Sequence, residues 1–306
     1  MKTIATSLCS AALSIALAAS ATVASAQTYD GSPYTAWAND YSGSEPHTLV
    51  LWKFNTAAPK ADSSENGRDV LINNSTGSSG FSNASVGVPG GRFGEGMFIS
   101  TRSTTDASSL DVSSSVSLFP SSALSLEFWF KPIEDGVAGG SLSYFVDKKY
   151  DSNTGVQLVL NNQGTGNGGS LQFIVANGAQ SSAVFSVRTS GLEWKTGEWY
   201  HVAATFEVNS EGDTLLKIFR NGEMLASDSR AGFGPIVNKA NSRWRLGNRL
   251  GSGYGAALGY YDNFRISDVA YQYAAIPEPS VAAIAALGGL GLLLASRRRR
   301  SATLRS

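Results

Sequence analysis

Residues 123–132 read ALSLEFWFKP, and this stretch decides the fold class. Its apolar residues stand at every second position from Leu124 to Phe130. Side chains two positions apart on a β-strand point to the same face, so this spacing predicts a strand with one buried face. The residues between them, including Glu127 and Trp129, share the opposite face.

Similar strand-like runs occupy much of the chain, at residues 48–54, 143–148, 155–161, 170–176, 183–188, 198–208 and 213–220. Turn-forming segments separate these runs, and the Asn221-Gly222 pair predicts a type I′ hairpin because both residues tolerate positive φ. No segment of this region shows a helical period. The pattern predicts an all-β sandwich of antiparallel sheets, with an aromatic core at Trp52, Phe128, Phe130, Trp199 and Phe206.

The first 26 residues have the order of a secretory signal peptide. Lys2 precedes an apolar run over 8–19, and Ala24-Ser25-Ala26 predicts cleavage between Ala26 and Gln27. A short N-terminal membrane anchor is the alternative, although the apolar run is too short to span a bilayer. The only cysteine, Cys9, lies in this segment, so we expect the exported chain to contain no disulfide.

We expect residues 27–47 to form a weakly ordered lead-in and residues 48–272 to form one domain. Without Lys2, the five tail arginines and Glu278, the 24 basic and 24 acidic residues fall to 18 and 23. The exported part therefore has a net charge of about −5, whereas a nucleic-acid-binding domain needs a basic surface. We expect no nucleic-acid partner.

Several motifs, taken in order along the chain, resemble one known family. They are LVLWKFN (49–55), ADSSENGRD (61–69), GRFGEGMFIS (91–100), ALSLEFWFKP (123–132), GEWYHVAATFE (197–207), IFRNGEMLA (218–226) and GYYDNFRISDVAY (259–271). Together they resemble the LamG-like jelly rolls of the concanavalin A-like lectin and glucanase superfamily. The resemblance runs from about residue 48 to 272. It implies an antiparallel jelly-roll β-sandwich whose first and last strands meet near one edge.

The resemblance also implies a structural calcium ion near the meeting of those two strands. By motif position, its ligands here are Asp62, Asn66 and Asp262, and oxygen ligands of these types suit Ca²⁺. Asn55 and Asn263 stand where the family carries aspartate, which weakens the expected site. The alternative is that Asp62 and Asn66 form Asx turns.

The sequence predicts no catalytic residues. A retaining glycosidase needs two carboxylates about 5 Å apart, and the E-x-D-x-x-E motif of the glucanase relatives is absent. Of the two histidines, His47 lies in the lead-in and His201 lies inside a strand, where we expect it to be packed or hydrogen-bonded. The alternatives are a divergent glycosidase and a purely structural, self-assembling coat protein.

The ligand-binding site cannot be identified from the sequence. The aromatic residues that could stack on a sugar are Tyr144, Tyr150, Trp194, Tyr254, Tyr260 and Tyr261. A second candidate region carries Arg243, Arg245 and Arg249. Alternation there predicts that Trp244 and Leu246 point inward and that the arginines lie on a solvated face.

Residues 273–306 end the chain with a three-part pattern. Pro277-Glu278-Pro279 is followed by a 15-residue apolar run over 281–295 and by Arg297, Arg298, Arg299 and Arg300. The apolar run is short for a membrane span, and the arginines favour the cytoplasmic side.

The pattern resembles the PEP-CTERM sorting signal, which implies transient membrane anchoring by a short C-terminal transmembrane helix and recognition in trans by an exosortase. An ordinary C-terminal anchor is the alternative. We expect a non-catalytic carbohydrate-binding or structural module, exported across the inner membrane to the cell surface or extracellular matrix of a Gram-negative bacterium.

Overall fold

The computed structural model of the protein describes residues 30–41, 45–55, 57–64, 66–72, 84–100, 110–112, 120–134, 142–148, 153–161, 169–179, 183–238, 244–247 and 255–276. The predicted signal peptide, with its cleavage site, and the motif, apolar run and arginines of the predicted sorting signal lie outside these residues. Within the described ranges, no helix has the length and apolar character needed to cross a membrane.

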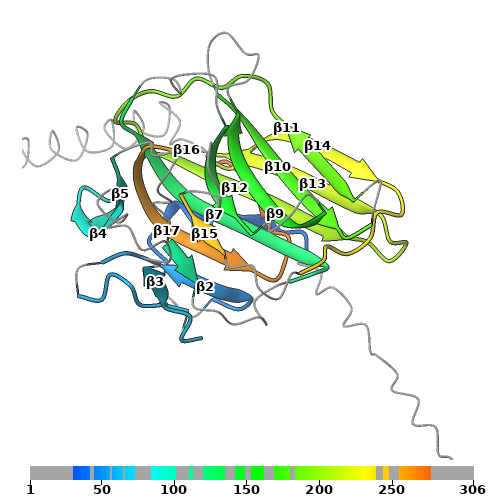
Figure 1. Ribbon diagram of the computed structural model, residues 1–306, viewed down its shortest axis with the longest axis horizontal. Coiled ribbons are helices and arrows are strands. Elements are labelled where there is room, and N and C mark those ends of the chain that lie inside the picture. The colour runs from blue at the N-terminus through cyan, green and yellow to red at the C-terminus, as the bar shows by residue number, and fades with distance from the viewer. Residues whose placement is uncertain are drawn as a thin grey trace, which may run out of the picture.

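Two antiparallel sheets, packed face to face, form the body of the molecule (Figure 1). Sheet I has the order β14-β13-β12-β7-β17-β5-β4, with β2 also paired to β17. Its strands are β2 (Thr48–Trp52), β4 (Ala84–Pro89), β5 (Glu95–Ile99), β7 (Ala123–Pro132), β12 (Tyr200–Val208), β13 (Thr214–Arg220), β14 (Glu223–Arg230) and β17 (Gly259–Ser267).

Sheet II has the order β11-β10-β9-β8-β15-β6-β3, with β16 added parallel to β8. Its strands are β3 (Val70–Ile72), β6 (Leu110–Val112), β8 (Leu142–Asp147), β9 (Thr154–Asn161), β10 (Ser170–Asn177), β11 (Val184–Arg188), β15 (Arg245–Leu246) and β16 (Gly255–Ala256). A short parallel pair, β1 (Pro33–Tyr34) and β18 (Gln272–Tyr273), and the 3₁₀ helix η1 (Ala36–Ala38) complete the described elements.

The alternation in 123–132 is confirmed by the packing of β7. Its alternate residues Leu124, Leu126, Phe128 and Phe130 belong to the main core between the sheets, together with Trp52 and Phe206. The all-β sandwich is therefore confirmed. In sheet I, β2 pairs with β17, so the first and last strands of the predicted domain meet as the resemblance implies.

The hairpin between β13 and β14 turns at Asn221 and Gly222, as predicted. Both residues have positive φ, at 52° and 78°, which is the combination a type I′ turn requires. A side chain at position 222 would also collide with the carbonyl of Ala274, since an added Cβ would lie 2.3 Å from that oxygen. The glycine therefore allows both the turn and the close approach of the C-terminal segment.

A β-bulge in β17 changes which side chains face outward. On β7, Trp129 and Glu127 are two residues apart, but their partners on β17 are Asp262 and Arg265, which are three apart. The extra residue is accommodated at Asn263, whose φ of 46° is left-handed. Asp262 and Arg265 consequently share the outer face of sheet I, although regular alternation would place them on opposite faces.

The described part of the lead-in packs on that outer face, which differs from the weakly ordered segment expected. Tyr34, Trp37 and Tyr41 are buried in a second apolar cluster with Trp129 and Tyr273. These aromatic side chains cover strand residues that would otherwise face water. Residues 273–276, assigned to the tail from sequence, also pack here, since Ala274 accepts a hydrogen bond from Trp37 Nε1 at 3.0 Å.

Candidate functional site

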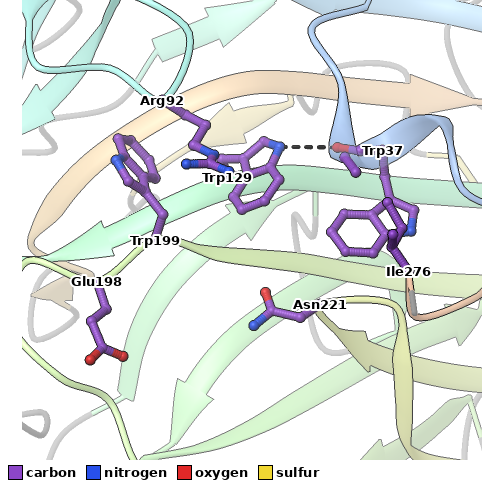
Figure 2. Close-up of a pocket in the computed structure, with 8 residues that line it drawn as sticks. Trp37, Arg92, Trp129, Glu198, Trp199, Asn221 and Ile276 are labelled. Atoms are coloured by element: carbon purple, nitrogen blue, oxygen red, sulfur yellow. Dashed lines mark hydrogen bonds between the residues drawn. The ribbon is translucent and has the colours of Figure 1, made fainter. Parts of the chain in front are cut away.

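A cleft of about 480 Å³ opens on the outer face of sheet I (Figure 2). We call it the tryptophan cleft. The residues that line it are Trp37, Ala38, Arg92, Trp129, Glu198, Trp199, Asn221 and Ile276. They come from the lead-in, the β4–β5 turn, β7, the entry to β12, the β13–β14 turn and the segment after β18. Its volume lies within the range of small-molecule sites.

The inner wall of the cleft is formed by Trp37 and Trp129, both about 5% exposed. Trp129 Nε1 donates to the carbonyl of Trp37 at 3.2 Å, and the two rings lie 5.8 Å apart. Trp37 also stacks on the imidazole of His201 at 4.7 Å. These contacts join the lead-in, β7 and β12, so this wall is built from segments distant in sequence.

The opposite wall carries Trp199, which the strand pattern predicts to lie in the core. That prediction is wrong: Trp199 is only partly buried, lies outside the main core and packs at the border of the second cluster. It precedes β12 at the position opposite Lys131, which faces outward on β7. The exposed Glu198 stands beside it, and its Oε2 accepts a hydrogen bond from Tyr200 at 3.0 Å.

Two cations border the cleft. The guanidinium of Arg92 lies 4.7 Å from the ring centroid of Trp129, and the ammonium of Lys131 lies 4.9 Å from that of Trp199. Lys131 also donates to the carbonyl of Gly90 at 2.9 Å, and burial lowers its pKa. Among the described residues neither cation has an ion-pair partner. Positive charge and aromatic rings therefore meet at this site.

Beneath the lead-in lies a buried polar network centred on Glu127. Its carboxylate accepts hydrogen bonds from Arg265 and from Tyr41 (2.6 Å), and His201 Nε2 lies 2.9 Å from it. Arg265 also contacts the hydroxyl of Tyr34. His201 is fully buried, as expected of a packed histidine, and burial lowers its pKa. The network supports the cleft wall without opening into it.

Stability should fall in acid because of Glu127. Burial alone would raise the pKa of this carboxyl, but Arg265, with His201 and Tyr41, lowers it from 4.5 to about 2. Below pH 4.5 this carboxyl becomes protonated in the unfolded chain while it stays ionised in the folded chain. The stability that the Glu127 carboxylate contributes is therefore lost as the pH falls toward 2. We expect a loss of about 3 kcal/mol over that window, measured by denaturant titration. A Glu127→Gln variant should show a smaller acid slope, and equal slopes would contradict the assignment.

The predicted calcium ligands fall in two places. Asp62 Oδ1 accepts from the amides of Leu51 and Ser64 at 3.0 and 2.9 Å, and Asn66 Nδ2 donates to the carbonyl of Thr48 at 3.0 Å. Both residues therefore hydrogen-bond to backbone groups of β2. On one side of β2, Trp52 forms a β-bridge with Asp62. On its other side, β2 pairs with β17, the strand that carries Asp262.

Asp262 has a separate set of partners. Its Oδ2 accepts from the amide of Phe93 at 2.9 Å and its Oδ1 from that of Asn263 at 2.7 Å, while burial raises its pKa to about 6. Within the described residues no group of three His, Cys, Asp or Glu side chains is placed to hold a metal. Each of the three residues has its own hydrogen-bond partners, and a shared calcium ion stays a prediction of the resemblance.

The ligand candidates drawn from sequence lie mostly elsewhere. Tyr144, Trp194 and Tyr261 are at most 2% exposed, whereas Tyr260 is partly exposed and stacks on Phe98 at 4.5 Å. Tyr150, Tyr254, Arg243 and Arg249 lie outside the described residues. Trp244 and Leu246 point into the core as predicted, but Arg245 is buried near Asp147, 3.8 Å away, instead of solvated.

The sequence pattern did not identify four residues of the cleft as site residues: Trp37, Arg92, Trp129 and Trp199. One signal was available, because the alternation of β7 puts Trp129 on the face shared with Ser125 and Glu127. A large aromatic residue on a polar face needs either a cover or a ligand. Of the described residues that line the cleft, Glu198 is the single carboxylic acid, so they do not provide the pair that glycoside hydrolysis uses.

Comparison with known proteins agrees with this fold. The model of a family described as "Concanavalin A-like lectin/glucanases superfamily" matches residues 103–276. No curated protein sequence matches the chain. Among solved structures, the binding domain of botulinum neurotoxin serotype D has a TM-score of 0.50 at 15% identity, covering 79% of this chain. The present chain spans about half of that one, 51% of its length.

Two further solved structures have lower TM-scores. Domain 4 of AbnA, an extracellular arabinanase from Geobacillus stearothermophilus in complex with arabinotriose, gives 0.49 at 20% identity, covering 73% of this chain and 93% of that one. The CBM40 of a Ruminococcus gnavus sialidase, bound to sialyllactose, gives 0.34 at 15% identity, covering 49% and 78% respectively.

Proposed function

Because the chain belongs to the concanavalin A-like lectin/glucanase superfamily, we propose that it is an exported protein whose jelly roll binds carbohydrate without catalysis. The tryptophan cleft is the binding site in this proposal. The polysaccharide partner is a component of the cell surface or the extracellular matrix.

The observation that carries the proposal is the composition of the cleft. A partly exposed indole at Trp199 stands beside a buried wall of Trp37 and Trp129, and Arg92, Glu198 and Asn221 add polar groups to the lining (Figure 2). Ring faces match the apolar faces of sugar rings, and the amide, carboxylate and guanidinium groups match their hydroxyls. A site with one lining carboxylic acid supports binding better than hydrolysis.

Replacement of Trp199 by alanine should abolish most of the binding. Truncating a central tryptophan of an interface costs about 2 kcal/mol or more, which corresponds to about 30-fold weaker binding. The measurement is retention of residues 27–276 on a panel of immobilised polysaccharides, followed by titration calorimetry on the best polymer. Because Trp199 is only partly buried, the thermal unfolding temperature of the Trp199→Ala variant should differ little from that of the wild type.

The matched control is Trp244→Ala, since Trp244 is buried in the main core away from the cleft. It should lower stability and leave the affinity of the folded fraction unchanged. If no polysaccharide retains the domain, the binding proposal fails and a scaffold role takes its place. Self-association of the purified domain would then support the coat-protein alternative, and hydrolysis of any polymer would support the divergent glycosidase.

The second part of the proposal concerns sorting. Residues 1–26 direct export, and residues 273–306 act as a PEP-CTERM signal that an exosortase reads before cleaving near Pro277-Glu278-Pro279. The short apolar run holds the chain transiently in the membrane, and the block from Arg297 to Arg300 keeps its end on the cytoplasmic side. This proposal rests on the sequence pattern.

Replacing Pro277-Glu278-Pro279 by three alanines should leave the precursor uncleaved in the inner membrane. The reason is that the apolar run and the arginines remain while the tripeptide that the sorting enzyme recognises is gone. Cell fractionation with immunoblotting against the jelly roll measures this, with Ser280→Ala as the neighbouring control. Normal processing of the triple variant would refute the sorting assignment.

A further inference from the structure

We propose that the tryptophan cleft selects acidic polysaccharides, with Arg92 and Lys131 binding the carboxylate or sulfate groups of the polymer. This inference rests on the proposed carbohydrate-binding function and adds the chemical class of the ligand. It also gives Arg92 a more specific role and brings in Lys131, which the carbohydrate proposal does not use.

Arg92 is held in a geometry that suits an anion. Its guanidinium lies over the rings of both Trp129, at 4.7 Å, and Phe93, at 5.7 Å. Stacking restricts the plane of the guanidinium but leaves its N–H groups, which lie in that plane, free to donate. Since Arg92 is exposed and has no ion-pair partner among the described residues, its fork is available for a bidentate contact with a carboxylate or sulfate.

Lys131 places a second cation on the outer face of sheet I, at the border of the cleft. Lys131 lies two residues after Trp129 on the same face of β7, so the backbone positions of Trp129 and Lys131 are about 7 Å apart. Its ammonium sits over the rings of both Trp199, at 4.9 Å, and Tyr260, at 4.3 Å. An ammonium partly removed from water and unpaired with a carboxylate gains most from an incoming anion.

The aromatic row extends beyond the cleft. Phe98, Tyr260 and Lys131 are direct neighbours across β5, β17 and β7, and Trp199 follows at the entry to β12. This row runs perpendicular to the strands and covers about 14 Å at the usual strand spacing. A surface of that length suits several residues of a chain more than a single sugar, so the ligand is a polymer.

Local charge and overall charge differ in sign. The exported chain has a net charge of about −5, so non-specific attraction does not bring an acidic polymer to it. Glu198 also lines the cleft, on the Trp199 side, and disfavours an anionic group placed beside it. The polymer must therefore orient its acidic groups toward Arg92 and Lys131, with hydroxyls toward Glu198.

The test compares chemically matched polymers. Alginate, polygalacturonate and hyaluronate are each immobilised beside the carboxyl-reduced form of the same polymer, and chondroitin sulfate beside a form that is both carboxyl-reduced and desulfated. We expect at least one acidic polymer to retain the domain, with about tenfold or greater weakening in its neutral form. Raising the salt from roughly 0.05 M to about 0.5 M should weaken the acidic interaction further, because the Debye length falls.

Variants locate the effect. Arg92→Met and Lys131→Met should each weaken binding to the acidic polymer about tenfold or more, and Arg92→Lys should recover only part of it because the fork is lost. Arg230→Met is the matched control. Arg230 also stacks on an aromatic ring, that of Phe233 at 5.1 Å, but it ends β14, at the opposite end of the β13–β14 hairpin from Asn221.

The outcomes separate this inference from the function on which it rests. If binding requires Trp199 but its affinity is independent of salt and equal for the acidic and neutral polymers, the ligand is not selected for acidic groups. Carbohydrate binding at the cleft would still stand. Acidic binding that Arg230→Met weakens as much as Arg92→Met would overturn the site. Retention on none of the polymers, acidic or neutral, would overturn the proposed function itself.

Discussion

Glu127→Ala should cost about 3–5 kcal/mol of unfolding free energy and leave the domain partly unfolded at ambient temperature. Glu127 is fully buried and pairs with Arg265, whose side chain is only 1% exposed. Among the described residues, removing the carboxylate leaves the buried guanidinium with one acidic partner, Glu45, which is 26% exposed. The hydroxyl of Tyr41 and the imidazole of His201 lose their acceptor as well.

Urea denaturation at pH 7 measures this loss. The matched control is Glu207→Ala on β12, where the carboxylate lies 3.5 Å from Lys217 and is 34% exposed. An exposed pair of this kind contributes about 1 kcal/mol or less. Equal effects of the two substitutions would mean that the buried network does not stabilise the fold.

Trp37→Ala should lower the unfolding free energy by about 3–5 kcal/mol, the usual cost of removing a large buried aromatic side chain. Trp37 is 5% exposed, stacks on His201 and donates to the carbonyl of Ala274, so it fastens both terminal segments to sheet I. Because it also forms the inner wall of the cleft, the folded variant should bind polysaccharide more weakly.

Comparison with Trp199→Ala separates these two roles of Trp37. The Trp199 variant should lose affinity with little loss of stability, whereas the Trp37 variant should lose both. Thermal unfolding and calorimetric titration on the same preparations provide the two readouts. If Trp37→Ala unfolds at the wild-type temperature, the lead-in does not stabilise the domain.

The fold itself was accessible from sequence because its signals are local. Alternation from Leu124 to Phe130 reports which face of β7 is buried, and the Asn221-Gly222 pair reports a hairpin turn. Both depend on residues a few positions apart, and both are confirmed by the packing and by positive φ. The order of motifs along the chain added the jelly-roll connectivity.

The candidate site was not accessible in the same way. Its lining extends from Trp37 to Ile276, so its residues meet only when sheet I has formed and both flanking segments have packed on its outer face. Trp199 illustrates the difficulty: it lies next to a buried strand and resembles a core residue in sequence, yet it precedes the first paired residue, Tyr200, and stays partly exposed. Periodicity assigns a face within a strand but loses its meaning where the strand ends.

The sequence by itself determined the long central strands, their inward faces and the family, because period-two alternation and turn chemistry are properties of short segments. Only the tertiary structure decided what covers the outer face of sheet I. The bulge at Asn263 turns Arg265 toward Glu127, and the aromatic side chains of the lead-in close over that pair. Each of these arrangements is stabilised by partners more than 80 residues away, as for Tyr41 and Glu127, and no local pattern encodes such a pairing.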